Sequence, residues 1–272
     1  MNLENYFISQ FKNAHIGDDG AFIDDTVYSK DAFFEGVHFK KEWMSYYQIA
    51  SKAMSANISD AIAMNAKPKY ALLSVAMPSY MSMAQMRELA SGFKETAARY
   101  GVEIIGGDTI GNTKLDITIT IISKTDKPLT RKGLKKGHLV AYSGELGRSA
   151  KDLKTLLNLG KIHKRSKFVD IKLRGKFVSK CSRYLSCGMD ISDGLFSDLG
   201  KLSSANRLGF NFYRHLSKRV GCSGEEYEML FGFDKRDRKC ILRVAKLCRT
   251  PITIVAQSAR KNYKNRCKAH HF

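Results

Sequence analysis

The chain has 272 residues, of which 43% are hydrophobic, so it can form one large domain or two of ordinary size, each with a sizeable core. No apolar run approaches the length of a membrane span, and we expect no signal peptide because residues 1–11 mix polar and apolar side chains. All six cysteines lie in the second half, and no two of them form a C-x-x-C pair. This usage favours reduced thiols and a cytoplasmic protein over a disulfide framework or a zinc site.

The positive charge is confined to one half of the chain. Residues 1–133 carry 15 basic and 15 acidic side chains, whereas residues 134–272 carry 31 and 11, which accounts for the whole net charge of +20. Such asymmetry is one sign of nucleic-acid binding. However, no block of five like charges occurs, and a basic half around phosphate ligands or a proteome-wide basic bias explains the charge as well. We therefore rank nucleic acid second, as an unlikely partner.

Hydrophobic periodicity predicts alternating strands and helices in the first half. Asp24-Asp25 fits a plain hairpin turn between a short strand that begins at Ala21 and a longer strand that carries Ser29. Apolar residues at helical spacing predict helices around 49–62 and over 83–100. Further strands are expected at 70–77, 102–105 and 115–122, and the alternation in the last of these is typical of a sheet covered on one face.

We place a domain boundary near residues 132–136, which gives an N-terminal domain of residues 1–133 and a C-terminal domain of residues 134–272. In the second domain we expect strands at 138–143, 209–213 and 251–256, an apolar run at 229–233, and helices at 150–159 and 238–247. Residues 160–180 are basic and poorly patterned. The alternation of strands and helices in both halves predicts an α/β (α+β) protein of two domains.

Four acidic residues of the first half lie at positions where the local sequence does not account for a carboxylate. Asp19 follows Gly17 in a glycine-flanked turn, and Asp31 shares the inward parity of its strand with Ser29. Asp60 lies among small and apolar residues of a helix, with no Arg or Lys within a helical turn, so a bound cation would satisfy it. Asp108 follows Gly106-Gly107, where we expect a tight turn whose backbone N–H groups can approach a phosphate. By contrast, a lone histidine such as His38 is more often structural than catalytic.

The densest motif of the second half is Gly188-Met189-Asp190-Ile191-Ser192-Asp193-Gly194-Leu195. The apolar residues from Leu195 onward recur at helical spacing, so the acids crowd the turn before a helix and only Asp198 lies inside it. Two nearby carboxylates repel each other unless a cation joins them, and Mg²⁺ is bound in this way together with substrate phosphates. Taken alone, an Asp helix cap with a solvated neighbour explains the motif equally well.

Six short motifs occur in an order that resembles a known family. They are Gly17-Asp18-Asp19, Glu35-Gly36-Val37-His38-Phe39, Asn57-Ile58-Ser59-Asp60, Gly106-Gly107-Asp108-Thr109, Asp190-Ile191-Ser192-Asp193-Gly194-Leu195 and Gly224-Glu225-Glu226-Tyr227-Glu228. Together they resemble thiamine-monophosphate kinase, in the aminoimidazole-ribonucleotide-synthetase-like superfamily of ATP-binding proteins. The selenophosphate-synthetase branch of that superfamily is less similar, because it lacks the second and the last motif.

The resemblance implies a fold, an activity and partners. The family has a two-domain synthetase-like fold in which the N-terminal sheet-plus-helices domains of a homodimer pair in a shared β-barrel. Its members transfer the γ-phosphoryl group of ATP to thiamine monophosphate (TMP) with several Mg²⁺ ions, which yields thiamine diphosphate. The alternatives are another ATP-using enzyme of the same superfamily and, less favoured, a basic nucleic-acid-binding protein.

The resemblance also assigns residues. It implies that the Mg²⁺ ligands are Asp19, Ser29, Asp31, Asp60, Asp108, Asp190 and Asp193. Contacts to ATP are implied for Gly107, Asp108, Arg131 and Ser192, and contacts to the thiamine phosphate for His38 and Glu225. Direct in-line transfer is expected, without a catalytic nucleophile, because phosphoryl transfer depends mainly on positioning and charge neutralisation.

The chain departs from the family pattern in several places. Lys30 stands where the family often has a small hydroxyl residue, and residues 160–180 lack a proline-containing segment common in the family. The second domain is short, and residues 267–272 match the family's terminal Asp-His-Phe only loosely. An aromatic residue that stacks on thiamine would fall near Arg266, which is not aromatic.

Overall fold

The computed structural model describes residues 3–11 and 13–267. Its helices are α1 (Leu3–Ile8), α2 (Tyr46–Ala63), α3 (Met83–Tyr100), α4 (Arg148–Leu157), α5 (Gly175–Cys181), α6 (Leu195–Asn206), α7 (Lys218–Gly221) and α8 (Arg238–Leu247). Its strands are β1 (Ala21–Ile23), β2 (Thr26–Phe34), β3 (Lys67–Pro78), β4 (Glu103–Asn112), β5 (Asp116–Lys124), β6 (Leu139–Ser143), β7 (Leu185–Asp190), β8 (Gly209–Phe212), β9 (Met229–Phe233) and β10 (Ile252–Ala259). The mixed α/β prediction is confirmed.

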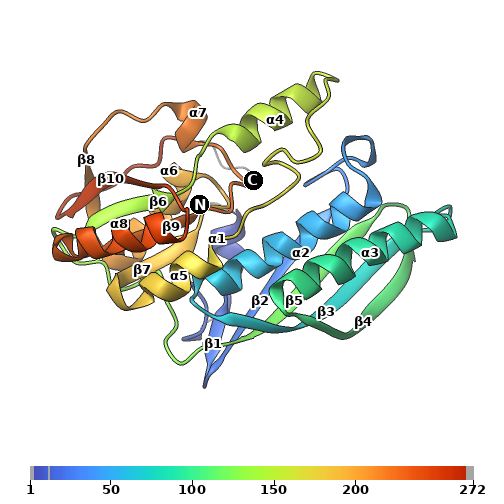
Figure 1. Cartoon of the computed structure of the whole chain (residues 1–272), viewed down its shortest axis with the longest axis horizontal. Helices are drawn as coiled ribbons and strands as arrows, with labels where there is room; N and C mark the ends of the chain where they lie inside the picture. The colour runs from blue at the N-terminus through green and yellow to red at the C-terminus, as the bar shows by residue number, and fades with distance from the viewer. Residues whose placement is uncertain (1–2, 12, 268–272) are drawn as a thin grey trace.

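The first sheet has the strand order β1-β2-β5-β3-β4, in which only β3 and β4 run parallel. The predicted hairpin is confirmed, since Ile23 pairs with Thr26 across Asp24-Asp25. Helices α2 and α3 lie side by side over this sheet (Figure 1). Their face of β5 is buried at every second residue from Ile117 to Ser123, and the alternate residues are partly exposed, as expected for a sheet covered on one face.

The second sheet has the order β7-β9-β6-β10-β8 and is antiparallel throughout. Both of its faces are covered, which explains why β6 and β9 are buried at every residue. On one face α6 packs through Leu195 and Leu199. On the other face α5 and α8 pack through Phe177 and Ile241, in a core that continues into the first sheet. The strands of the two sheets lie on either side of residue 133, and the domain boundary there stays a prediction.

Two local predictions are wrong. The expected turn at Gly106-Gly107-Asp108 is part of the continuous edge strand β4, which pairs with β3 through a bulge between Ala71 and Leu72. Both glycines have positive φ angles, and a Cβ on Gly107 would collide with the carbonyl oxygen of Leu73. The glycines therefore serve a close approach between neighbouring strands and not a reversal of the chain.

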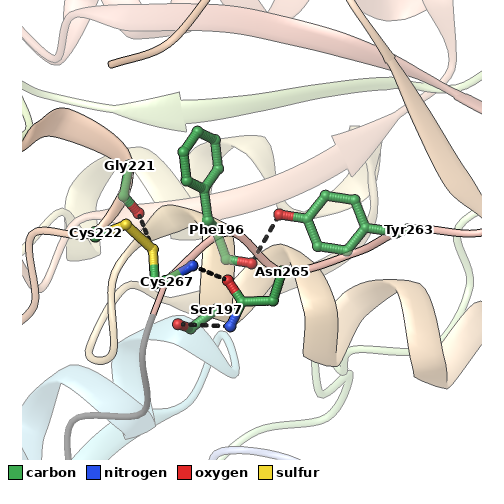
Figure 2. Close-up of a disulfide and its surroundings, with 7 residues drawn as sticks. All are labelled: Phe196, Ser197, Gly221, Cys222, Tyr263, Asn265 and Cys267. Atoms are coloured by element: carbon green, nitrogen blue, oxygen red, sulfur yellow. Dashed lines mark hydrogen bonds between the residues drawn. A yellow bond between two sulfur atoms is a disulfide. The ribbon is translucent and has the colours of Figure 1, made fainter. Parts of the chain in front are cut away.

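The expectation that all cysteines are free is also wrong, because Cys222 and Cys267 form a disulfide (Figure 2). Cys181, Cys187, Cys240 and Cys248 are free. The disulfide joins positions 45 residues apart, and no spacing motif in the sequence marks such a pair. No helix among the described residues is long and apolar enough to cross a membrane.

Candidate active site

The helix α2 positions more of the site than any other element. Ser45 starts it with a capping box, in which its side chain accepts a hydrogen bond from the N–H of Gln48 and its own N–H is bound by the Gln48 side chain. The helix is buried on nearly all sides from Ile49 onward, because it lies between the first sheet, α3 and the second half of the chain. Polar side chains on such a helix need partners inside the protein.

Four carboxylates from distant parts of the sequence gather beside α2. Asp19 precedes β1, Asp31 lies on β2, Asp60 lies on α2, and Asp190 ends β7. We call these four residues the acid cluster. Hydrogen bonds hold three of its members: the N–H of Asp31 donates to Asn57 Oδ1 (2.9 Å), Ser59 Oγ donates to Asp190 Oδ2 (2.7 Å), and the N–H of Asp190 donates to Asp19 Oδ2 (3.1 Å).

Burial raises the pKa of every member of the acid cluster, and repulsion between carboxylates raises it further for Asp31, Asp60 and Asp190. Burial is the largest cause for Asp60, followed by the charges of Asp31 and Asp190, and the pKa lies well above its usual value. Burial and then Asp19 raise the pKa of Asp190 in the same way. Asp31 is exposed as a residue, yet the loss of water around its carboxyl group still comes first among the causes that raise its pKa. Keeping these carboxylates together in the ionised form is therefore unfavourable unless a cation joins them.

Two basic side chains flank the acid cluster. Arg131 donates to Asp19 Oδ1 through both Nε (3.1 Å) and a terminal nitrogen (2.6 Å), so Asp19 is paired although burial still raises its pKa. Lys201 lies 2.6 Å from Asp193 and 2.8 Å from Asp198. Burial raises the pKa of Asp198 to about 7, and Lys201 acts in the opposite direction. Asp198 lies inside α6, which begins at Leu195 as predicted.

The donors of this region suit a hard cation. They are carboxylate oxygens and the buried hydroxyl group of Ser29, which has no hydrogen-bond partner among the described residues. Within residues 3–11 and 13–267, no three His, Cys, Asp or Glu side chains lie close enough together to hold a metal ion by themselves. The acid cluster is therefore not a closed cage. Mg²⁺ commonly keeps water ligands and is completed by substrate phosphates, so an open arrangement fits it.

Asp108 does not join the acid cluster within one chain. It is exposed on β4, at the edge of the first sheet, and β3 and β5 separate β4 from β2. Because neighbouring strands lie about 4.8 Å apart, this separation amounts to about 14 Å of sheet. Gly107 lies beside Asp108 on the same edge strand and is likewise separated from β2 by β3 and β5.

The structure links Ser192 to Glu225 through the backbone. The N–H of Glu225 donates to the carbonyl oxygen of Ser192 (2.7 Å), and Tyr227 is bound to Ile191 in the same way (2.8 Å). Glu225 and Tyr227 have φ angles of 53° and 50°, an uncommon conformation for residues other than glycine. The last motif is therefore held in an unfavourable conformation against the Asp190–Asp193 motif.

His38 lies in the turn after β2 and is held by the end of that strand. Its Nδ1 accepts a hydrogen bond from the N–H of Phe34 (3.0 Å), and its ring stacks on Phe33 with 5.4 Å between the ring centres. Because Nδ1 accepts, a neutral His38 carries its proton on Nε2. Near the end of the chain, the guanidinium group of Arg266 lies 5.7 Å from the ring of Phe196, and residues 268–272 lie outside the described part of the chain.

Sequence reasoning missed the partners that fix these groups. Ser59 was quoted only as part of a motif, yet it binds Asp190 across 131 positions of sequence. Lys52 was passed over, although it is fully buried and its Nζ lies 2.8 Å from Glu225 Oε2. A signal for Lys52 existed, because a lysine between Ile49 and Ala53 interrupts the apolar face of α2.

Comparison with known proteins agrees with this arrangement. Residues 17–125 match the model of the AIR synthase related protein, N-terminal domain. The thiamine-monophosphate kinase of Leptospira interrogans is 32% identical, over 78% of this chain and 77% of that protein. That of Nitrosopumilus maritimus is 30% identical, over 77% of this chain and 74% of that protein. The chain belongs to the thiamine-monophosphate kinase family.

The fold has a close counterpart among solved structures. AaThiL, in complex with AMPPCP and TMP, superposes with a TM-score of 0.88 over 99% of this chain and 96% of that chain, at 23% identity. At this identity the likeness concerns the fold. It extends through both sheets, although the second half departs from the family pattern at several positions in sequence.

Proposed function

We propose that the protein transfers the γ-phosphoryl group of ATP to TMP and so forms thiamine diphosphate and ADP. The observation that carries the proposal is the acid cluster, where four carboxylates converge in a member of the thiamine-monophosphate kinase family. Phosphoryl transfer between two polyanions needs positive charge and exact placement more than a protein nucleophile. The ligands of AaThiL, an ATP analogue and TMP, are consistent with this reaction.

For the metal we propose Mg²⁺, held by Asp19, Ser29, Asp31, Asp60, Asp190 and Asp193, with Asp108 as a further ligand. When bound, Mg²⁺ would offset the repulsion among these carboxylates and neutralise charge on the transferred phosphoryl group. The chain's own part is to keep the carboxylates in place. Asn57 fixes the backbone of Asp31, Ser59 orients Asp190, and Arg131 holds Asp19.

We assign ATP contacts to Gly107, Asp108, Arg131 and Ser192, and contacts to TMP to His38 and Glu225. The N–H of Phe34 donates to His38 Nδ1 and so fixes the orientation of the His38 ring. Glu225 lies in the loop bound to Ser192, so the acceptor is placed next to the turn that carries Asp190 and Asp193. Direct in-line transfer follows, since donor and acceptor phosphates would meet beside the same carboxylates.

A homodimer is part of the proposal. The face of the first sheet opposite α2 and α3 carries Tyr28, Tyr70 and Leu72, each about two-fifths exposed (42%, 42% and 38%). The edge strand β4 adds Ile105 and Ile110, which are 50% and 57% exposed. Exposed apolar side chains along an open sheet edge favour association, and a second copy would cover them and bring new neighbours to Asp108. Ile110→Lys should lower the molar mass measured by light scattering towards that of a monomer.

One assay tests the central reaction. The purified full chain is mixed with Mg²⁺, ATP and TMP, and ADP release and thiamine diphosphate are measured, with aminoimidazole ribonucleotide precursors and other phosphorylated acceptors in parallel. We expect ADP and thiamine diphosphate to form in equal amounts, and only with TMP. ADP release that depends on a different acceptor would assign the protein to another ATP-using activity of the superfamily.

A further inference from the structure

Lys52 is a charged residue in the interior of the protein. It lies in the first half of α2, and its side chain is 0% exposed. A buried ammonium group is costly unless it is paired, so a lysine persists in such a place only where the surroundings compensate for the lost water. None of the metal, ATP or TMP contacts assigned above uses this residue.

Three groups surround the ammonium group. Lys52 Nζ lies 2.8 Å from Glu225 Oε2, 3.5 Å from the ring centre of Phe168, and 5.7 Å from the ring centre of Phe33. The negative faces of aromatic rings attract cations, most strongly where water is excluded. Burial lowers the pKa of Lys52, and the charge and hydrogen bond of Glu225 act in the opposite direction. The lysine is therefore held by one carboxylate and one aromatic ring.

Glu225 is fixed at its backbone and at one oxygen. Its N–H is bound to Ser192, its φ angle is 53°, and its Oε2 is bound to Lys52. In the part of the chain that the structure describes, Oε1 makes no hydrogen bond, and the side chain is 24% exposed. Glu225 thus keeps one carboxylate oxygen without a hydrogen bond to the described residues, in a loop that is bound to the Asp190–Asp193 motif.

The acid cluster explains why Glu225 needs a partner. The pKa of the nearby Tyr227 is raised by burial first, and then by the charges of Glu225, Asp31, Asp190 and Asp60. The charge of Glu225 and the charges of the acid cluster therefore act on the same Tyr227 side chain. An unpaired Glu225 would be repelled by those carboxylates and would turn towards solvent. Lys52 offsets this repulsion and keeps the carboxylate in one orientation.

We infer that Lys52 is a positioning residue of the acceptor site. Its ammonium group holds Oε2 of Glu225, so that Oε1 faces the ring of an acceptor that carries a permanent positive charge, as the thiazolium ring of TMP does. This inference rests on the proposed function. It adds the requirement that the acceptor be cationic. The Lys52–Glu225 ion pair, between α2 and the loop that follows α7, would then select the acceptor.

The test compares Michaelis constants for the two substrates. Lys52→Met keeps an unbranched apolar side chain between Phe33 and Phe168 but removes the charge. Because a hydrogen bond between charged groups contributes about 1.5–3 kcal/mol, we expect the KM for TMP to rise about 10- to 100-fold, with the KM for ATP nearly unchanged. Glu225→Gln should raise the KM for TMP by a similar factor. The double variant should be little worse than either single variant, because one interaction is lost in all three.

A matched control removes an exposed ion pair of similar length. Lys124 lies 2.6 Å from Asp25 near the start of β2, and Lys124→Met should leave both Michaelis constants unchanged. A neutral-ring analogue of TMP should bind wild type and Glu225→Gln equally well in a competition assay. Equal binding of TMP itself by these two proteins would overturn the inference.

A second variant tests the inference if Lys52→Met does not fold. Phe168→Leu then removes the ring beside the ammonium group and should raise the KM for TMP alone, by a smaller factor. Equal rises in both Michaelis constants, or independent effects of Lys52→Met and Glu225→Gln, would assign Lys52 a purely structural role. Absence of any TMP-dependent turnover in wild type would instead refute the proposed function.

Discussion

Ser59 and Asp190 join the two halves of the chain at the acid cluster. Ser59 Oγ on α2 donates to Asp190 Oδ2 at the end of β7 across 2.7 Å, and both residues are buried. The bond favours the ionised form of Asp190, whereas burial and the charge of Asp19 oppose it. The Ser59 hydroxyl group is therefore the largest of the influences that keep this carboxylate ionised, although burial and Asp19 outweigh it.

Ser59→Ala should weaken metal binding. Without the hydroxyl group the pKa of Asp190 rises further, so a cation has to displace a proton that is held more tightly. We expect the Mg²⁺ concentration for half-maximal rate to increase several-fold and the free energy of unfolding to fall by about 1–3 kcal/mol. Ser55→Ala, at a buried serine one turn earlier on α2, is the control and should lower stability without changing the Mg²⁺ dependence.

Asp60→Asn should stabilise the metal-free protein while it abolishes turnover. The pKa of Asp60 is raised on folding, so its ionised form destabilises the folded state. This destabilisation is absent below the unfolded pKa of about 3.9 and grows as the pH rises towards the folded pKa. In metal-free buffer, the melting temperature of wild type should fall with rising pH in this range, and that of Asp60→Asn should fall less. Asp126→Asn, at an exposed site, should behave as wild type.

The activity of Asp60→Asn decides whether Asp60 is a ligand. We expect a loss of several orders of magnitude in kcat/KM, since the charge that would bind the metal is gone. Near-normal activity at low Mg²⁺ would show that Asp60 is not a metal ligand, even if the melting temperature rises as expected.

Local patterns predicted much of the fold. The helical spacing of residues 83–100 and the alternation of residues 115–122 correspond to α3 and β5. Local patterns failed where tertiary contacts decide. Two glycines before Asp108 indicated a turn, but the approach of β4 to Leu73 accounts for them. Residues 160–174 showed no pattern, yet Phe168 and Ile171 are buried there without regular structure.

The candidate site was predictable in its residue types but not in its pairings. Carboxylates at glycine turns indicated a cation site, and Asp19, Asp31, Asp60 and Asp190 do gather. The pairing of Asp19 with Arg131 spans 112 positions, and no local signal encodes such a contact. Asp193 is expected to converge with Asp190 on cations; in the structure Lys201 lies 2.6 Å from it, and its part in metal binding stays a prediction. Only the fold determines which cation each carboxylate meets.

Mg²⁺ and a non-hydrolysable ATP analogue together should raise the melting temperature clearly, and either alone should raise it little. A ligand that binds only the folded protein stabilises it by mass action, and the metal and the nucleotide phosphates each need the other's charge here. Asp190→Asn combined with Asp193→Asn should abolish the rise. A full ligand-induced shift in this double variant would contradict the placement of Mg²⁺ at the second motif.

The disulfide between Cys222 and Cys267 should stabilise the fold through the C-terminal tail. It closes a loop of 45 positions, and loss of such a link destabilises proteins by about 2–4 kcal/mol. Close by, the Tyr263 hydroxyl group donates to the carbonyl oxygen of Phe196 (2.8 Å), and Asn265 binds Ser197 (Figure 2). The tail is thus attached to the start of α6, next to the Asp190–Asp193 motif. These hydrogen bonds remain when the disulfide is reduced. We therefore expect the free energy of unfolding to fall by an amount near the lower end of the 2–4 kcal/mol range, about 2 kcal/mol.

Cys222→Ser and treatment of wild type with dithiothreitol should therefore lower the melting temperature by similar amounts, and dithiothreitol should have no further effect on Cys222→Ser. Cys240→Ser, at an exposed free cysteine, is the matched control and should leave the melting temperature and its response to dithiothreitol unchanged. Because α6 carries Asp198 and begins two residues after Asp193, the reduced protein should also need more Mg²⁺ for half-maximal rate. An oxidised and a reduced protein with the same melting temperature would show that the tail bonds alone hold the start of α6.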